Sequence, residues 1–520
     1  MVRNETPVND RTPPVLRPEH PSARSLVGLV DEFGLKHVGS LDGVEVTGVT
    51  LRTTEVQPGD LYVGVRGAHN HGAAFAAQAV EAGAVAMLTD AEGAELARDS
   101  GLPIVLVESP RTALGDVSAW VYRTTEYPPL LLGITGTNGK TSTAYILEGI
   151  LKQLGLVTGL SSTAERHIGD LTVVSRLTTP EASEMHALLA RMRESEVRAV
   201  AVEVSAQALT ANRVDGIVFD VVGFTNLSHD HLDDYADMDE YLAAKALFFD
   251  NDRGKRGVVS LDTPYGARIV DHSHIPVTTV SATPGITGEW NLTIVDETPA
   301  YTEFTLTGPE NRSITTRVPL IGWHMAANAG LAIVMLVEAG FELEAIGHAL
   351  GDGGIQAYLP GRTERISGDR GPSVYVDFGH SPDAFVNTLA AVRKFTDGKV
   401  IMVFGADGDR DATKRHDMGR VASEGSDILV ITDHHPRFED PASIRATLVE
   451  GAALASDPAE LHEVSPPEHA IRVAVGLAKE GDSILWAGPG HQDYRDIRGE
   501  RTPYSARAEA RDALREAGWS

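Results

Sequence analysis

The segment from residue 130 to residue 151 constrains the fold most strongly, because it joins an apolar strand, a glycine-rich turn and a helix. It reads LLLGITGTNGKTSTAYILEGIL. The backbone amides of such a turn and the N-terminus of the following helix form a concave site for phosphate oxygens. Lys140 is expected to reach the β- and γ-phosphates of a nucleotide, and Thr141 offers a hydroxyl to Mg²⁺. Gly136 and Gly139 let the backbone approach phosphate without a Cβ clash.

This turn departs from the usual GxxxxGK[ST] spacing of a phosphate loop. Ile134 stands where the first glycine is expected, and glycines occur at Gly133 and Gly136 instead. An ordinary glycine turn between a strand and a helix is the alternative interpretation. Because the strand, the GKT triplet and the helix occur together, we favour phosphate binding.

The order of apolar and amphipathic runs predicts an α/β protein with three domains and mostly parallel sheets. A chain of 520 residues exceeds what one core supports. We expect a disordered Pro-rich tail at residues 1–25 and domains at residues 26–125, 126–354 and 355–520. The first junction follows from the paired prolines of TTEYPPL. Thr-rich and Val-rich runs between about residues 275 and 320 predict antiparallel hairpins, followed by a helix at residues 324–339.

Composition excludes several classes of partner. The net charge of −28 disfavours nucleic acid and anionic membranes, although small anionic substrates need only a local cationic loop. The absence of cysteine excludes disulfides and thiolate chemistry. Neither a secretory signal nor an apolar run long enough to span a membrane is present, so we expect a cytoplasmic protein. We also expect a monomer.

Two downstream segments carry candidate metal ligands. Glu203 follows the apolar run of AVEVSAQAL, and its carboxylate would join the Thr141 hydroxyl on one Mg²⁺, which prefers hard oxygen ligands. His231 and Lys245 lie in GFTNLSHDHLDDYADMDEYLAAKALFF. The alternative is that Glu203 and His231 are solvated residues at strand ends and that Lys245 extends from a helix into solvent.

The TGTNGKT turn and the DHLD and AAKALFF segments together resemble the Mur ligases. From about residue 50 to the C-terminus, the chain is similar to the subfamily that adds the third residue of the peptidoglycan stem peptide. The resemblance implies a small α/β UDP-binding N-terminal domain, a central phosphate-loop ATPase domain and a C-terminal Rossmann-like domain. It also implies functions in peptidoglycan synthesis, cell shape and cell division.

The resemblance implies ATP and Mg²⁺ as cofactors. A second ion would be held by His231 and by Lys245 carbamylated by CO₂, and Arg362 and Asp377 would close over ATP when the third domain rotates in. Asn328 aligns with a nucleotide-contacting asparagine, whereas the preceding family asparagine is replaced by Met325. The residues expected to hold the nucleotide are Gly136, Thr137, Asn138, Gly139, Lys140, Thr141, Asn328, Arg362 and Asp377.

The expected substrates are a UDP-N-acetylmuramoyl dipeptide and a free amino acid. For the former, the family pattern places Thr53, Thr178, Thr179, Ser205 and Arg213 in contact with substrate. This chain departs from that pattern at Arg52, Thr54 and Ala211.

The amino-acid site is altered in this chain. Relatives that use diaminopimelate carry D-N-P-R and G-K-G-H-E motifs, which here read HHPR and GPGHQ. Arg410 and Arg437 can still grip a carboxylate, but His434 and Gln492 replace two anionic partners of an ammonium. Neutral acceptors or a nearby acid such as Asp433 would then hold the ammonium, and we lean toward lysine or ornithine. The residues expected to contact the amino acid are Arg410, His434, His435, Pro436, Arg437, Gly488 and Gln492.

The chemistry implied is ATP-dependent formation of an amide through an acyl phosphate, for which no protein nucleophile is needed. One alternative is a ligase of the folylpolyglutamate synthase type, but the PGDLYVGVRG segment resembles a UDP-binding domain that those enzymes lack. Another is a non-catalytic nucleotide-binding paralogue, suggested by the departures at Arg52, Ala211, Met325, His434 and Gln492. Against it stand the retained Lys140, Thr141, Glu203, His231, Lys245 and Arg410.

Overall fold

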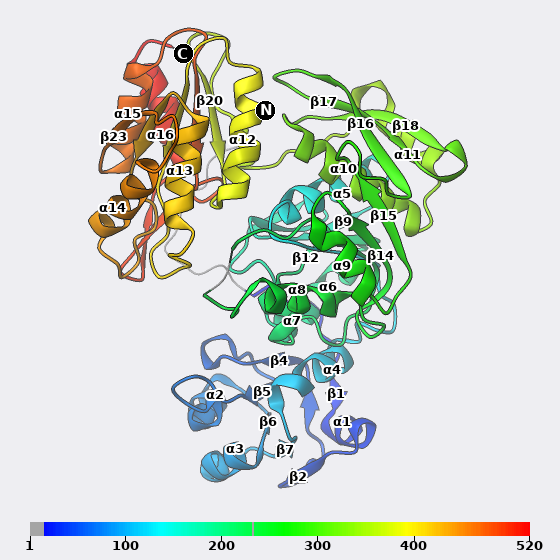
Figure 1. The fold of residues 1–520 in the computed structure, drawn as a ribbon. Coiled ribbons are helices and arrows are strands. Elements are labelled where there is room, and N and C mark those ends of the chain that lie inside the picture. The colour runs from blue at the N-terminus through cyan, green and yellow to red at the C-terminus, as the bar shows by residue number, and fades with distance from the viewer. Residues whose placement is uncertain (1–14, 231–232, 520) are drawn as a thin grey trace.

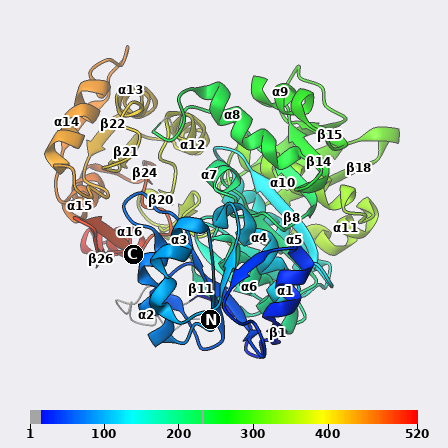
Figure 2. The ribbon, with the colours of Figure 1, turned by 90° about the horizontal axis from the view of Figure 1, so that it is seen from below.

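The structure is a computed structural model that describes residues 15–230 and 233–519. It confirms the predicted fold class, because three α/β units with mostly parallel sheets follow one another along the chain (Figure 1). Viewed from below, the N-terminal unit lies in front, with the central and third units side by side behind it (Figure 2).

The N-terminal unit is a five-stranded sheet in the order β2-β7-β6-β5-β4, in which only β2 is antiparallel to its neighbour. Its elements are β1 (Arg24–Ser25), α1 (Leu26–Phe33), β2 (Lys36–Val38), β3 (Glu45–Val46), β4 (Gly48–Thr50), β5 (Asp60–Gly64), α2 (Ala76–Ala82), β6 (Ala86–Thr89), α3 (Ala91–Leu96), β7 (Ile104–Leu106) and α4 (Pro110–Tyr122).

Part of the expected disordered tail is ordered and packed against the domains. Arg17 Nη1 donates to both carboxylate oxygens of buried Asp60, at 2.7 and 2.8 Å. The backbone amide of Glu19 donates to the Glu194 carboxylate of the central unit. Arg24 and Ser25 pair with β3. The expectation was therefore wrong for residues 15–25, because their polar groups find specific partners that composition does not show.

The central unit is an eleven-stranded sheet in the order β11-β10-β9-β12-β8-β13-β14-β15-β16-β17-β18. Its elements are β8 (Leu130–Thr135), α5 (Lys140–Gln153), β9 (Thr158–Ser161), β10 (Glu165–Ile168), β11 (Leu171–Val174), α6 (Ala182–Glu194), β12 (Ala199–Glu203), α7 (Ala206–Thr210), β13 (Phe219–Phe224), α8 (Met238–Ala246), β14 (Gly254–Ser260), α9 (Pro264–His272), β15 (Val277–Ser281), β16 (Trp290–Glu297), β17 (Thr302–Thr307), β18 (Ser313–Val318), α10 (Trp323–Glu338) and α11 (Leu343–Leu350).

The middle strands of this sheet, β12, β8 and β13, are parallel and buried, which explains their continuous apolar runs. Helices α5 and α10 pack against each other over one face, in a core that includes Leu132, Ile146 and Ile333. The predicted hairpins are confirmed for β16 to β18, and the predicted helix is α10. Residues 277–281 instead form the parallel strand β15, because this segment extends the buried sheet beside β14.

The third unit is a six-stranded sheet in the order β19-β20-β24-β21-β22-β23, parallel except at β19, with a short hairpin beside it. Its elements are β19 (Glu364–Arg365), β20 (Ser373–Asp377), α12 (Pro382–Lys394), β21 (Val400–Phe404), α13 (Arg415–Gly425), β22 (Ile428–Ile431), α14 (Pro441–Ala452), β23 (Glu460–Glu463), α15 (Pro467–Leu477), β24 (Ser483–Ala487), β25 (Tyr494–Ile497), β26 (Glu500–Pro503) and α16 (Ala506–Glu516).

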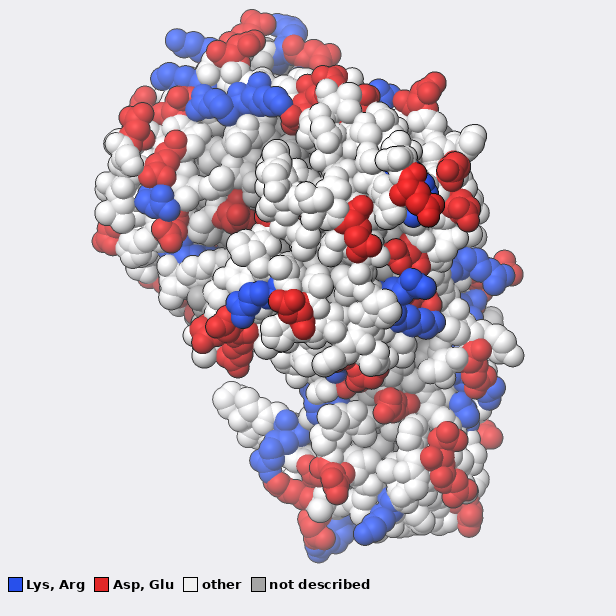
Figure 3. All heavy atoms as spheres, turned by 45° about the vertical axis from the view of Figure 1, so that its right-hand side comes forward, with Lys and Arg blue, Asp and Glu red and all other residues white. Residues whose placement is uncertain are grey.

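Acidic and basic side chains are interspersed over the face of the molecule in Figure 3, so the acidic residues form no single continuous patch on that face. Across the part of the chain that the structure describes, no helix has both the length and the apolar character needed to cross a membrane.

Candidate active site

A cavity of about 640 Å³ lies between the central and third units, where the carboxyl ends of their parallel strands face each other. Its volume is in the range of small-molecule sites. Most of the residues expected at the site line it, namely Thr137, Asn138, Gly139, Lys140, Thr141, Thr178, Thr179, Glu203, Ser205, Arg213, Asn328, Arg362, Asp377, Arg410, His434, Arg437, Gly488 and Gln492. Thr53, Gly136, Lys245, His435 and Pro436 do not line it.

The turn between β8 and α5 has a backbone conformation that favours glycine at two positions. Gly136 and Gly139 have φ values of +147° and +86°, which L side chains rarely adopt. A Cβ on Gly136 would lie 1.9 Å from Thr225 Oγ1, and one on Gly139 would lie 2.6 Å from Asn328 Oδ1. Asn226 Oδ1 accepts a hydrogen bond of 2.9 Å from the Asn138 amide. Glycine is therefore needed at both positions.

Lys140 begins α5 and curls over the turn. Its Nζ donates to the carbonyl oxygens of Gly136 and Thr137, each at 2.9 Å. Burial lowers the pKa of Lys140, while the carboxylates of Glu203 and Asp230 oppose that shift. Among the described residues, Lys140 Nζ thus has only backbone oxygens as direct partners, and a phosphate can compete for it.

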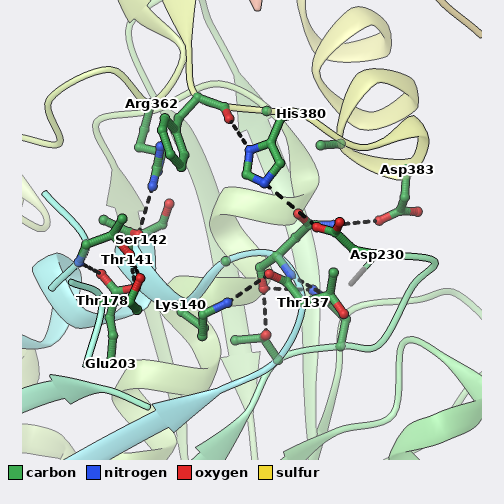
Figure 4. Close-up of a pocket in the computed structure, with 18 of the residues that line it drawn as sticks. Thr137, Lys140, Thr141, Ser142, Thr178, Glu203, Asp230, Arg362, His380 and Asp383 are labelled. Atoms are coloured by element: carbon green, nitrogen blue, oxygen red, sulfur yellow. Dashed lines mark hydrogen bonds and ion pairs between the residues drawn. The ribbon is translucent and has the colours of Figure 1, made fainter. Parts of the chain in front are cut away.

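Arg362 of the third unit reaches into the same place. Its Nη2 donates to Thr141 Oγ1 at 2.8 Å (Figure 4). The guanidinium lies 4.5 Å from the centre of the Phe378 ring. The Nη1 atom is buried and has no hydrogen-bond acceptor among the described residues. Burial lowers the pKa of Arg362, with Asp377 and Glu203 opposing. A phosphate group would supply the missing acceptor.

Asp377 and Asn328 also line the cavity. Asp377 ends β20, and its two oxygens accept from the amides of Thr363 and Gly379, both at 2.7 Å. Asn328 is buried on α10 against Gly139, and Met325 is buried one turn earlier on the same helix.

Glu203 is the most buried acid at the cavity, with none of its surface exposed. It ends β12, and its oxygens accept from the amide and hydroxyl of Thr163, at 2.9 and 3.0 Å. The Thr163 hydroxyl is also 3.0 Å from that of Thr178. Carboxylate and hydroxyl oxygens therefore meet beside Thr141, as Figure 4 shows, and this donor set suits Mg²⁺.

Lys245 lies behind the turn rather than in the cavity. It is 1% exposed, and its Nζ donates to the Gly136 carbonyl at 2.9 Å and lies 4.3 Å from the centre of the Tyr241 ring. Burial first, and the neighbouring charge of Lys140 second, lower its pKa well below the ordinary value. The alternative of a solvent-exposed lysine is therefore wrong. His231, its expected partner, lies outside the described residues.

The residues expected to contact the UDP-sugar peptide are divided between two places. The Thr179 hydroxyl donates to the Glu203 carbonyl at 2.8 Å and accepts from the amide of Ser205 at 3.1 Å, so this corner of the cavity is fixed. Arg213 Nε lies 3.2 Å from the Glu181 carboxylate. Thr53 lies in a short 3₁₀ turn of the N-terminal unit, away from the cavity lining.

Several contacts that hold the third unit over the turn were missed by sequence reasoning. Lys414 Nζ lies 2.6 Å from Asp230 Oδ1 in a buried ion pair, and His380 Nε2 lies 3.7 Å from the other oxygen of Asp230. Asn138 Nδ2 donates to Asp383 at 3.3 Å. Figure 4 shows Asp230, His380 and Asp383 above the turn. The segments that hold them are similar to family motifs, but the sequence did not show that these side chains meet one another.

The far end of the cavity holds the residues expected to contact the amino acid. Burial first, and His435 second, lower the pKa of His434 to about 3, so His434 is neutral. Its Nε2 lies 3.5 Å from Asp407 Oδ1, and Arg437 Nη2 lies 3.5 Å from Asp407 Oδ2. Asp407 was not among the expected residues.

Asp433, which we suggested as an ammonium partner, faces away from this end of the cavity. It pairs with Arg445 and accepts a hydrogen bond of 2.6 Å from the Ser465 hydroxyl, and it does not line the cavity. That suggestion was wrong, because Arg445 of helix α14 already pairs with this carboxylate. His435 is buried behind the cavity between Gln492 and the Asp496 amide.

Comparison with known proteins agrees with this geometry. Residues 45–122 match the catalytic domain of the Mur ligase family, residues 134–336 the Mur ligase middle domain, and residues 361–490 the Mur ligase glutamate ligase domain. A UDP-N-acetylmuramyl-tripeptide synthetase of Leifsonia xyli is 61% identical over 98% of this chain and 99% of its own. A UDP-N-acetylmuramoyl-L-alanyl-D-glutamate–2,6-diaminopimelate ligase of Streptomyces avermitilis is 42% identical over 96% and 98% of the two chains.

The fold is also that of a solved ligase. The structure of a UDP-N-acetylmuramoyl-L-alanyl-D-glutamate–2,6-diaminopimelate ligase, 24% identical, superposes with a TM-score of 0.64 over 96% of this chain and 100% of that one. Fold and cavity thus define a nucleotide-dependent ligase built from three α/β domains. The chain belongs to the Mur ligase family and is an ATP-dependent, ADP-forming ligase. The resemblance inferred from the sequence is confirmed.

Proposed function

We propose that the protein adds the third amino acid to the D-glutamate carboxylate of UDP-N-acetylmuramoyl-L-Ala-D-Glu in the cytoplasm, as a monomer, during cell-wall synthesis that supports cell shape and division. The observation that carries this proposal is the continuous cavity. It has Lys140, Thr141 and Glu203 at one end and Arg410 and Arg437 at the other. A phosphate donor and an amino acid can therefore occupy one continuous cavity.

In the proposed reaction, an oxygen of the substrate carboxylate attacks the γ-phosphorus of ATP, the bond to the β,γ-bridging oxygen breaks, and ADP leaves. The amine of the amino acid then attacks the acyl carbon, and phosphate departs with the C–O electron pair while the amine loses a proton to it. Lys140 and Arg362 counter the charge that accumulates on the transferred group.

We place Mg²⁺ between the Thr141 hydroxyl and the Glu203 carboxylate. The buried oxygen donors fit a hard divalent cation, and none of the described residues bonds a cationic side chain to Glu203. Thr141 and Glu203 would hold this ion, and the ion would supply positive charge that offsets the charge of the phosphate oxygens.

We propose further that Lys245 is carbamylated and, with His231, contributes to a second ion site. Its burial and lowered pKa favour the uncharged amine, which is the form that reacts with CO₂. The carbamate would have to turn from the Gly136 carbonyl toward the cavity. The UDP-sugar peptide is assigned to Thr53, Thr178, Thr179, Ser205 and Arg213.

The test is ADP release by the purified protein with ATP, Mg²⁺, the UDP-muramoyl dipeptide and a panel of amino acids, with the product identified by mass. We expect turnover that depends on both acceptor substrates. ATP binding without turnover of any amino acid would instead support the non-catalytic paralogue.

The Lys245→Ala variant tests the carbamate separately. We expect activity to be lost and partly restored by a short-chain carboxylate added to the buffer, because a free carboxylate can replace the carbamate oxygens. Lys255→Ala is the control, since Lys255 is an exposed lysine paired with Asp220 outside the cavity. Unchanged activity of Lys245→Ala would exclude the proposed role.

A further inference from the structure

The third domain presents an acid to the amino-acid end of the cavity at a place that the sequence comparison did not single out. Asp407 follows β21, while His434 and Arg437 follow β22, and Gly488 and Gln492 follow β24. These strands are adjacent and parallel, so the three loops converge at one edge of the sheet. All five residues line the cavity.

Asp407 differs from the other acids of the third domain that line this cavity. Asp377 uses both oxygens to accept backbone amides, and Asp383 accepts from Asn138. Asp407 Oδ1 is buried, yet no hydrogen bond reaches it from the described residues. A buried carboxylate oxygen without a donor is costly unless a ligand supplies one.

The neighbours of Asp407 leave room for a cation. His434 is neutral, so it cannot balance the carboxylate charge. Burial would raise the pKa of Asp407, but the electrostatic effect of its neighbours, among them the Arg437 guanidinium, outweighs burial and lowers that pKa. Arg437 approaches only Oδ2, at 3.5 Å. His435 is committed, because its Nε2 bonds to Gln492 at 2.8 Å and its Nδ1 accepts from the Asp496 amide at 3.0 Å.

We infer that Asp407 binds the side-chain ammonium of the incoming amino acid, and that this amino acid is a diamino acid with a single carboxylate. The inference rests on the proposed ligase function. An ammonium has three N–H donors and no acceptor, so it complements an ionised acid with an unused oxygen. Relatives that use diaminopimelate have an aspartate at the position of His434. In this chain Asp407, which follows the neighbouring strand β21, supplies a carboxylate instead.

The same geometry disfavours a second carboxylate on the side chain. Arg437, which could grip such a group, is already shared with Asp407. A diaminopimelate carboxylate placed there would face the Asp407 charge. Arg410, in the loop that follows Asp407, remains for the α-carboxylate that every amino acid carries.

The test compares lysine, ornithine and 2,4-diaminobutyrate with their uncharged counterparts norleucine, norvaline and 2-aminobutyrate, and with meso-diaminopimelate. The wild-type enzyme should use one of the diamino acids at least tenfold better, in kcat/KM, than its uncharged counterpart and diaminopimelate. Asp407→Asn should lose about ten- to 150-fold in kcat/KM for that diamino acid, the value of one charged hydrogen bond. Its KM for ATP should not change.

Two further variants keep the result interpretable. Asp409→Asn, in the same loop but outside the cavity lining, should behave as wild type. Asp407→Glu keeps the charge but extends it by one methylene, so it should shift the preference toward a shorter diamino acid. Retained discrimination in Asp407→Asn, no shift in Asp407→Glu, or a wild-type preference for diaminopimelate would overturn the inference.

Hydroxylamine separates this inference from the proposed function. It is a small amine that can trap an acyl phosphate without using the amino-acid end of the cavity. Wild type and Asp407→Asn should form the hydroxamate and release ADP equally with the UDP-muramoyl dipeptide. If wild type forms no hydroxamate and turns over no amino acid, the proposed ligase function fails. If hydroxamate forms normally but diamino acids are not preferred, only the role of Asp407 fails.

Discussion

Removal of the Arg362 guanidinium should weaken ATP binding by a predictable amount. In the structure, Nη2 bonds to Thr141 Oγ1 at 2.8 Å, whereas Nη1 is buried without an acceptor among the described residues. A phosphate oxygen that accepts from Nη1 forms a charge-assisted hydrogen bond, worth about 1.5–3 kcal/mol. Arg362→Ala should therefore raise the KM for ATP about ten- to 150-fold. The KM for ATP of Arg362→Lys should lie between those of wild type and Arg362→Ala. Lysine keeps the charge but loses the planar guanidinium and its contact with Phe378.

The assay is ADP release at saturating UDP-muramoyl dipeptide and amino acid, with ATP varied, together with direct ATP titration of the protein. Arg365→Ala is the matched control, since this exposed arginine lies three residues further along, outside the cavity. It should leave the KM for ATP unchanged. The reasoning is refuted if Arg362→Ala and Arg362→Lys both bind ATP within twofold of wild type.

Two more predictions concern Gly139 in the turn between β8 and α5 and the buried His167 on β10. Gly139→Ala places a Cβ 2.6 Å from Asn328 Oδ1 at a φ of +86°, so a strain of about 1–3 kcal/mol should raise the KM for ATP, as steady-state kinetics will measure. Burial lowers the pKa of His167, but hydrogen bonds to Glu148 and Glu165 outweigh this and raise it to about 9. Protonated His167 therefore contributes fully to the free energy of unfolding below pH 6.5. This contribution is lost as pH rises through 9, and the loss is roughly 3 kcal/mol at most. In melting curves recorded from pH 6 to 10, wild type should lose this stability at high pH and His167→Gln should not. An equal decline in the melting temperature of both proteins would contradict the prediction.

The nucleotide loop was predictable because its determinants are contiguous. The glycines, Lys140 and Thr141 lie within six residues between a strand and a helix, so local chemistry specifies both conformation and ligand. The alternation of strands and helices likewise indicated parallel sheets. The burial of Lys245 was not predictable in this way. It depends on contact with Gly136, which is more than one hundred residues away in the sequence.

The amino-acid end of the cavity was less predictable, because its residues meet only through the order of strands in the third sheet. The sequence showed that acids were lost at His434 and Gln492, but not that Asp407 lies beside His434. Asp433 was the nearer acid in sequence, yet its pairing with Arg445 withdraws it from the cavity. Closeness in the sequence therefore pointed to Asp433, whereas the order of strands in the sheet places Asp407 at the cavity.

The central claim is that the terminal phosphoryl group of ATP passes to an oxygen of the substrate carboxylate. The most direct measurement uses UDP-muramoyl dipeptide labelled with ¹⁸O in its D-glutamate γ-carboxylate, with the released phosphate analysed by mass spectrometry. The account predicts that each phosphate carries one oxygen from the labelled carboxylate. Phosphate free of label, released at the same rate as the peptide product, would contradict it.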